Sequence, residues 1–154
     1  MNEINLFEEL RHQNIIQLHE IHETNNFLHL VTDPIQGVSL EDILSRQIFK
    51  DEFSDDQIMH VFHEILECAA YIASKGVMHR DLSPKNIVLE KGGRIKLIDI
   101  GLATPINLPK YIFSKCGTPG YVAPEVFEYI EGVPSTHYND RCDVFSVGCI
   151  FFYM

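Results

Sequence analysis

The stretch HRDLSPKN at residues 79–86 is the part of the chain around which the rest is organised, and the triplet DIG at residues 99–101 begins thirteen positions after its asparagine. Between the two motifs, the apolar, β-rich runs 87–89 and 94–98 flank the pair Gly92-Gly93. Glycine accepts the positive φ angles that a tight hairpin turn requires. The sequence therefore predicts an antiparallel hairpin between the two motifs.

The hairpin predicts a metal-binding arrangement. If its turn is centred between the two glycines, Asn86 lies directly opposite Asp99. Directly opposed residues share a face, with Cβ atoms roughly 4.5–5.5 Å apart. Asp81 lies on the segment that enters the first strand, so a third polar side chain reaches the same end. Amide and carboxylate oxygens are ligands that suit Mg²⁺, and we expect a magnesium site there.

The order and spacing of these motifs, with APE at residues 123–125, resemble the catalytic core of eukaryotic protein kinases. The approach CGTPGY at residues 116–121 resembles the serine/threonine type. The resemblance covers nearly the whole chain and implies an α+β, two-lobed fold. Its parts would be a partial, β-rich small lobe at residues 1–31, a hinge at 32–38, and an incomplete helical large lobe with the catalytic and activation loops at 39–154.

The resemblance implies ATP-dependent phosphorylation of Ser or Thr in a protein substrate, with Mg²⁺ as the metal. Asp81 would accept the proton of the substrate hydroxyl, and Thr118 would contact Asp81. Asn86 and Asp99 would hold Mg²⁺. The alternative roles are a turn-capping aspartate for Asp81 and an ordinary strand-end residue for Asp99.

The resemblance also implies residues that bind the nucleotide. Glu3 would pair with a phosphate-binding lysine, although a solvated helix glutamate remains an alternative because that lysine is not in this chain. Thr32 would lie at the back of the adenine pocket, and Asp33 and Ile35 would offer backbone hydrogen bonds to adenine. Val88 would form the pocket floor. For Val88 and Ile35, a plain core position is equally compatible with the sequence.

The chain departs from the family pattern at Ser83, where serine/threonine kinases usually carry a lysine that touches the γ-phosphate. A hydroxyl cannot neutralise developing charge, but Lys85, two residues later, could supply the cation. The second hypothesis is therefore a non-catalytic, kinase-like (pseudokinase) binding or scaffold module.

Arg80, directly before Asp81, suggests a loop controlled by phosphorylation, because a phosphate opposite a buried arginine can order a segment. Ser114, four residues before Thr118, matches the usual acceptor position, which implies an upstream activating kinase as a partner. The alternatives are Thr104 or Tyr111 as the acceptor, or an unmodified polar loop.

Both ends of the chain are expected to be incomplete. No glycine-rich phosphate loop and no lysine-bearing strand precede Glu3, and the chain ends inside a helix that begins near Asp140. We expect these residues alone to have little or no activity, since the rate enhancement depends on pre-organised positioning. Whether they fold alone stays open, because the apolar run 144–154 would then be partly exposed.

Composition narrows the partners and the compartment. The formal net charge of -10 argues against a general nucleic-acid or anionic-membrane binder. The four cysteines show no C-x-x-C spacing, which favours free thiols in a reducing, cytoplasmic compartment. The first residues lack a secretory signal, and the run 144–154 is too short to span a bilayer.

Hydrophobic periodicity and turn residues predict the remaining elements. We expect helices over residues 3–11, 39–46, 54–75 and 140–154, and strands over residues 15–18 and 27–31. Residues 103–120 are predicted to form a long loop, and residues 134–139 a second irregular stretch.

Overall fold

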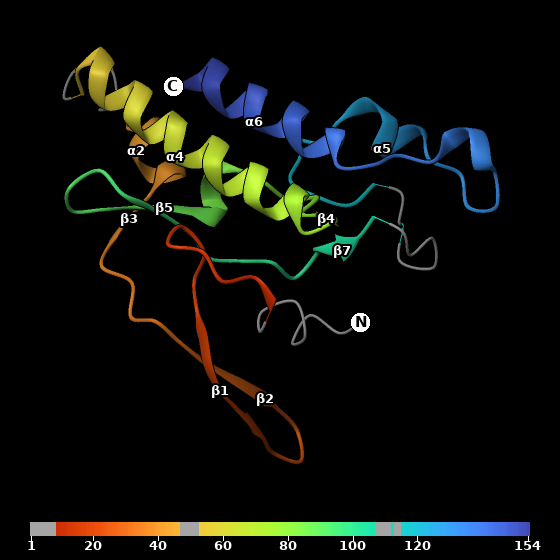
Figure 1. Cartoon of the computed structure of the whole chain (residues 1–154), viewed down its shortest axis with the longest axis horizontal. Helices are drawn as coiled ribbons and strands as arrows, with labels where there is room; N and C mark the ends of the chain where they lie inside the picture. The colour runs from red at the N-terminus through yellow and green to blue at the C-terminus, as the bar shows by residue number, and fades with distance from the viewer. Residues whose placement is uncertain (1–8, 47–52, 107–111, 113–114) are drawn as a thin grey trace.

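The computed structural model describes residues 9–46, 53–106, 112 and 115–154, and its mixture of helices and strands confirms the α+β class. The helices are α2 (Leu40–Ser45), α4 (Asp55–Ser74), α5 (Pro124–Glu128) and α6 (Arg141–Tyr153). The strands are β1 (Leu18–Glu23), β2 (Leu28–Thr32), β3 (Gly37–Ser39), β4 (Val77–Met78), β5 (Ile87–Glu90), β6 (Ile95–Leu97) and β7 (Thr104–Pro105). Two short 3₁₀ turns cover Pro84–Asn86 and Pro134–Thr136. Helices α4 and α6 lie side by side, and the β1–β2 hairpin extends away from them (Figure 1).

Helix α4 forms where its cap and its apolar face predict it. The Ser54 hydroxyl accepts the Gln57 N–H, and the Gln57 side chain accepts the Ser54 N–H, which completes a capping box. The buried face of the helix packs into the main hydrophobic core. Its buried apolar members are Val61, Ile65, Cys68 and Ile72.

The β5–β6 hairpin exists, but the predicted register is wrong by one residue. Both glycines have positive φ, 93° at Gly92 and 85° at Gly93, as expected. The turn, however, contains three residues, 91–93, because the Glu90 N–H bonds to the Arg94 carbonyl. Asn86 consequently accepts from the N–H of Ile98 (2.9 Å) and does not lie directly opposite Asp99.

The first predicted strand lies elsewhere. Residues 15–16 are buried and attach to β6, with the Ile16 N–H donating to the Leu97 carbonyl (2.9 Å) and the Leu97 N–H to the Asn14 carbonyl (2.7 Å). The extended strand is β1, which pairs with β2 and is half-buried or exposed along its whole length. The apolar run 15–18 thus marks the attachment of the hairpin to β6.

Some short elements have no counterpart in the prediction. Strand β7 lies inside the predicted loop 103–120 and pairs with β4, and β3 begins in the predicted hinge, extends one residue past it and pairs with β5. Helix α5 has only five residues. Elements this short show no measurable periodicity, so tertiary pairing and not local pattern determines them.

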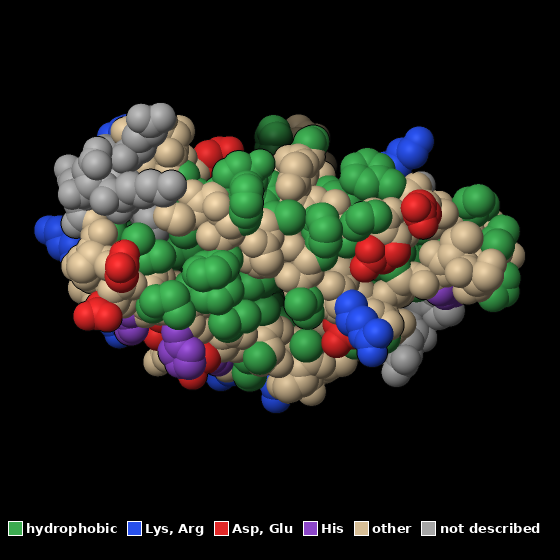
Figure 2. Space-filling model, turned by 90° about the horizontal axis from the view of Figure 1, so that it is seen from above, with side chains coloured by type: hydrophobic (Ala, Val, Ile, Leu, Met, Phe, Trp, Pro, Cys, Tyr) green, Lys and Arg blue, Asp and Glu red, His purple; other side chains and the backbone are tan. Residues whose placement is uncertain are grey.

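Hydrophobic side chains gather on the surface over α4 and α6 (Figure 2). The exposed ones include Leu66 on α4 and Val144, Phe151 and Phe152 on α6. Among the described residues, no helix has the length and apolar character needed to cross a membrane.

Candidate active site

The backbone at residues 79 and 80 is anchored to the start of α6. The carboxylate of Asp143 accepts the backbone N–H groups of His79 (2.6 Å) and Arg80 (2.7 Å). Burial raises the pKa of Asp143, while His79 and the two N–H donors act to lower it. Arg80 has a positive φ of 67°, so the carboxylate holds the backbone in a conformation that L residues rarely adopt.

His79 has a structural role in this arrangement. Its side chain is buried, and burial lowers its pKa, with the charge of Asp143 opposing the shift. Nδ1 accepts the N–H of Asp81 (3.2 Å), so the ring is neutral with its proton on Nε2. His79 therefore positions the backbone of Asp81.

The carboxylate of Asp81 is the meeting point of the site. Asn86 Nδ2 donates to Asp81 Oδ2 (3.0 Å) and to the Asp81 carbonyl (2.9 Å). Lys85 Nζ lies 3.4 Å from the same Oδ2, and Thr118 Oγ1 donates to Oδ1 at 2.5 Å. The structure thus brings together Asp81, Lys85, Asn86 and Thr118, all four residues expected at the catalytic centre.

Thr118 reaches Asp81 because Gly117 allows the two segments to approach. A Cβ on Gly117 would lie 2.6 Å from the carbonyl oxygen of Arg80, and Gly117 has a φ of 101°. Thr118 Oγ1 also lies 3.2 Å from Ser83 Oγ. Ser83 is completely buried, so its hydroxyl faces Thr118 and is not presented to a ligand.

Asn86 and Asp99 provide oxygen donors of the kind that Mg²⁺ prefers. Because the Asn86 amide nitrogen donates to Asp81, its Oδ1 is left without a hydrogen bond to the described residues. Asp99 is exposed, and its Oδ1 accepts the Gly101 N–H (2.8 Å). No group of three or more His, Cys, Asp or Glu residues in the described ranges could hold a metal by itself. The donor set therefore fits a cation that takes further ligands from a phosphate or from water.

The residues expected around adenine occupy different environments. The N–H of Asp33 is used by the Gln17 carbonyl (3.0 Å), and the Asp33 carbonyl lies 3.4 Å from Thr32 Oγ1. Ile35 is half-buried against the main core, and its backbone groups bond to none of the described residues. Val88 is buried in β5 between its partners in β3 and β6.

Arg80 is held from two directions. Its Nε donates to the Leu102 carbonyl (2.7 Å), and its Nη1 donates to the Tyr138 hydroxyl (3.3 Å). Burial raises the pKa of Tyr138 to about 12. Sequence reasoning missed Tyr138 because it lies in an irregular stretch with no motif. Glu3 and Ser114 lie outside the described residues.

A cavity of about 770 Å³ lies apart from these side chains, between the β5–β6 turn and α4, and neither Asp81, Asn86 nor Asp99 lines it. Its lining includes Gly37, Ile43 and His60. The cavity therefore does not belong to the site around Asp81.

Known proteins resemble this chain over nearly its whole length. A family model described as "Protein kinase domain" matches residues 1–154. The chain is 33% identical over 152 residues to the serine/threonine-protein kinase PLK4 of Xenopus tropicalis. The aligned region covers 98% of the chain and 15% of that relative. It is 36% identical over 154 residues to the calcium/calmodulin-dependent protein kinase type II of Caenorhabditis briggsae. That aligned region covers 97% of the chain and 27% of that relative. The chain thus spans between 15% and 27% of these relatives' lengths.

Proposed function

Because the chain belongs to the protein kinase domain family, we propose that it supplies the catalytic segment of an enzyme that transfers the γ-phosphoryl group of ATP to Ser or Thr side chains of proteins. One observation carries the proposal: the Asp81 carboxylate lies within contact of Asn86, Lys85 and Thr118. A carboxylate held at this point can accept a hydroxyl proton. The two relatives described above are named as protein kinases.

The chain's own residues have distinct tasks in this reaction. Asp81 orients the substrate hydroxyl and takes its proton, and Asn86 keeps Oδ2 of that carboxylate in place through its amide nitrogen. Lys85, whose side chain is 43% exposed, provides the cation near the transferred phosphoryl group that buried Ser83 cannot provide. Such positioned charges supply most of the catalysis in phosphoryl transfer.

Asn86 and Asp99 would hold Mg²⁺, which neutralises phosphate charge when it is bound. We assign adenine recognition to the carbonyl of Asp33 and to the backbone of Ile35, since the Asp33 N–H is already used. Thr32 and Val88 would border this pocket, and Glu3 would orient a phosphate-binding lysine. These roles divide the chain into a small-lobe portion (1–31), a hinge (32–38) and a large-lobe portion (39–154).

Regulation by phosphorylation is part of the proposal. Arg80 is buried, and it bonds to the Leu102 carbonyl and to Tyr138. A phosphate on Ser114 would add a charged acceptor for Arg80 and so order the loop that carries Thr118. An upstream kinase would place that phosphate.

The remaining assignments concern partners and compartment. The net charge of -10 supports protein substrates over nucleic acid or anionic membranes as partners. The four cysteines are free, which supports a reducing, cytoplasmic compartment.

The test is the incubation of the full-length purified protein with Mg²⁺, γ-labelled ATP and a mixed protein substrate. The proposal expects label on phosphoserine or phosphothreonine, and loss of labelling when Mg²⁺ is chelated. Label on phosphotyrosine alone would contradict the assigned acceptor. Absence of transfer despite stoichiometric nucleotide binding would establish the second candidate, a kinase-like binding module, which the burial of Ser83 favours.

A further inference from the structure

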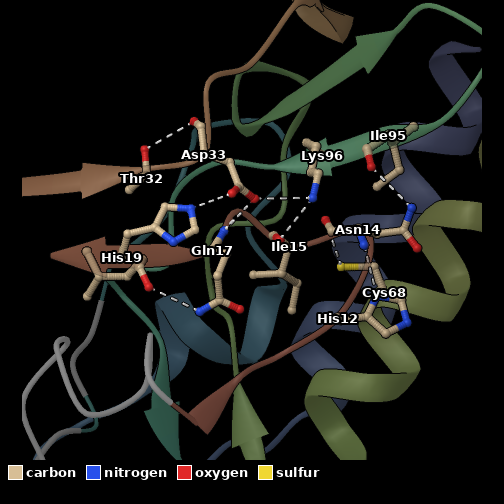
Figure 3. A network of polar contacts seen from close by, with 11 residues as sticks. His12, Asn14, Ile15, Gln17, His19, Thr32, Asp33, Cys68, Ile95 and Lys96 are labelled. Atoms are coloured by element: carbon tan, nitrogen blue, oxygen red, sulfur yellow. Dashed lines mark hydrogen bonds and ion pairs between the residues drawn. The ribbon is translucent and has the colours of Figure 1, made fainter.

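The Asp33 carboxylate joins residues from two different parts of the fold (Figure 3). Its Oδ1 lies 2.7 Å from Nε2 of His19, a residue of β1. Its Oδ2 accepts the N–H of Gln17 (3.3 Å) and lies 3.6 Å from Nζ of Lys96, the central residue of β6. One side chain at the end of β2 therefore contacts both the base of the β1–β2 hairpin and the strand that leads to Asp99.

These contacts are partly shielded from water. The exposed fractions of the side chains are 19% for Lys96 and 29% for Asp33, compared with 51% for His19. Lys96 Nζ is also 3.5 Å from the carbonyl oxygen of Ile15, so it has a second partner at the hairpin attachment. A shielded ion pair with additional hydrogen bonds contributes more to stability than an isolated surface pair, because water screens it less.

The contacts of Asp33 lie where they can set the position of residues 33–36, the segment proposed to bind adenine. Residues 22–31 of the hairpin are exposed, and Figure 1 shows the hairpin extending away from α4 and α6. Residues 33–36, which follow the hairpin, contain no helix or strand. The orientation of this segment thus depends on the backbone hydrogen bond of the Asp33 N–H with Gln17 and on the side-chain contacts of Asp33.

We propose that Asp33, paired with Lys96 and hydrogen-bonded to His19, forms a latch that fixes residues 33–35 relative to β6. Since β6 leads directly to Asp99, the latch holds the adenine-binding backbone at a constant position relative to the metal-binding carboxylate. His19 and Lys96 are positioning residues, and this role rests on the proposed function of the site. Pre-ordering the segment lowers the entropic cost of binding a nucleotide.

The latch itself is tested without any nucleotide, by amide hydrogen exchange at Asp33, whose N–H donates to the Gln17 carbonyl. Lys96→Met should accelerate this exchange by about threefold or more, the factor expected for a partly shielded pair. Lys96→Arg should restore the wild-type rate because it keeps the charge. Lys91→Met, at an exposed lysine of the β5–β6 turn, is the matched control. Equal exchange rates in Lys96→Met and Lys91→Met would overturn the latch.

The positioning role is tested by the affinity of the full-length protein for Mg-ADP. Lys96→Met should weaken binding by about three- to fivefold, and Lys96→Arg should bind within about twofold of the wild type. Faster exchange with unchanged affinity would overturn the positioning role. If the wild-type protein does not bind Mg-ADP at all, the proposed function fails, and the exchange experiment still decides whether the latch exists.

Discussion

At the scale of single residues, Asp143 shows how a buried carboxylate orders the backbone of a loop. It accepts two adjacent backbone N–H groups and so fixes Arg80 at positive φ. The same contacts place the His79 ring against the Asp81 N–H. The geometry of Asp81 therefore depends on a residue more than sixty positions later in the chain.

Asp143→Ala should destabilise the protein by about 2–4 kcal/mol, because it leaves two buried N–H groups without an acceptor. Urea unfolding measures this loss. Asp140→Ala is the control, since Asp140 makes no side-chain cap for α6 and its removal should change stability by less than about 0.5 kcal/mol. Equal stabilities of the two variants would contradict the anchoring role.

The Asp33 carboxylate should stabilise the folded protein less as the pH falls. The hydrogen bond from His19 lowers the pKa of Asp33 below its usual value of 3.8. A carboxylate whose pKa is lower in the folded state stabilises the fold above its unfolded pKa and loses this effect as the pH falls through the folded pKa. The free energy of unfolding should thus decrease more steeply below about pH 4 in the wild type than in Asp33→Asn. Parallel pH profiles of the two proteins would count against this account.

At the scale of elements, the sequence predicts the β5–β6 hairpin but not the register in which its two strands pair. The motifs at residues 79–86 and 99–101 predicted that Asp81, Asn86 and Asp99 gather at the open end of a hairpin, and the structure joins Asp81 and Asn86 by a hydrogen bond. They could not determine the register, because a two-residue and a three-residue turn both suit Gly92-Gly93. A one-residue slip changes which residue opposes Asn86.

Other features were beyond prediction for a related reason. The contacts of Tyr138 with Arg80 and of Lys96 with Asp33 join residues that share no local pattern, and β7 is only two residues long. Only the folded chain brings such groups together. Helix α4, with its cap and continuous apolar face, was predictable because its determinants are local.

Two glycines should respond in opposite directions to substitution by alanine. A Cβ on Gly37 in β3 would lie 2.3 Å from the Leu89 carbonyl oxygen and 2.6 Å from Val88 Cγ1, so Gly37→Ala should cost roughly 1–3 kcal/mol. Gly148 in α6 has no atom within 4 Å of its Cβ position, and Gly148→Ala should stabilise the helix by about 0.5–1 kcal/mol. Thermal unfolding of both variants measures the difference, and shifts of the same sign would contradict the described packing.

At the scale of the whole molecule, the apolar surface over α4 and α6 predicts self-association (Figure 2). Phe152 is 84% exposed and Val144 is 70% exposed. Contiguous exposed apolar area favours contact between chains. Phe152→Glu should therefore reduce concentration-dependent association in sedimentation velocity without lowering the melting temperature. Unchanged association would show that this surface is not responsible.

The site around Asp81 draws on three parts of the molecule: α6 anchors its backbone, the proposed metal ligands Asn86 and Asp99 flank the β5–β6 hairpin, and Thr118 contacts Asp81. The most direct test is the rate of phosphoryl transfer to protein by the full-length protein and its Asp81→Asn variant, with Glu131→Gln as an exposed control. We predict a decrease of about 10²- to 10⁴-fold for Asp81→Asn and no change for Glu131→Gln. Equal rates for the wild type and Asp81→Asn would contradict the account.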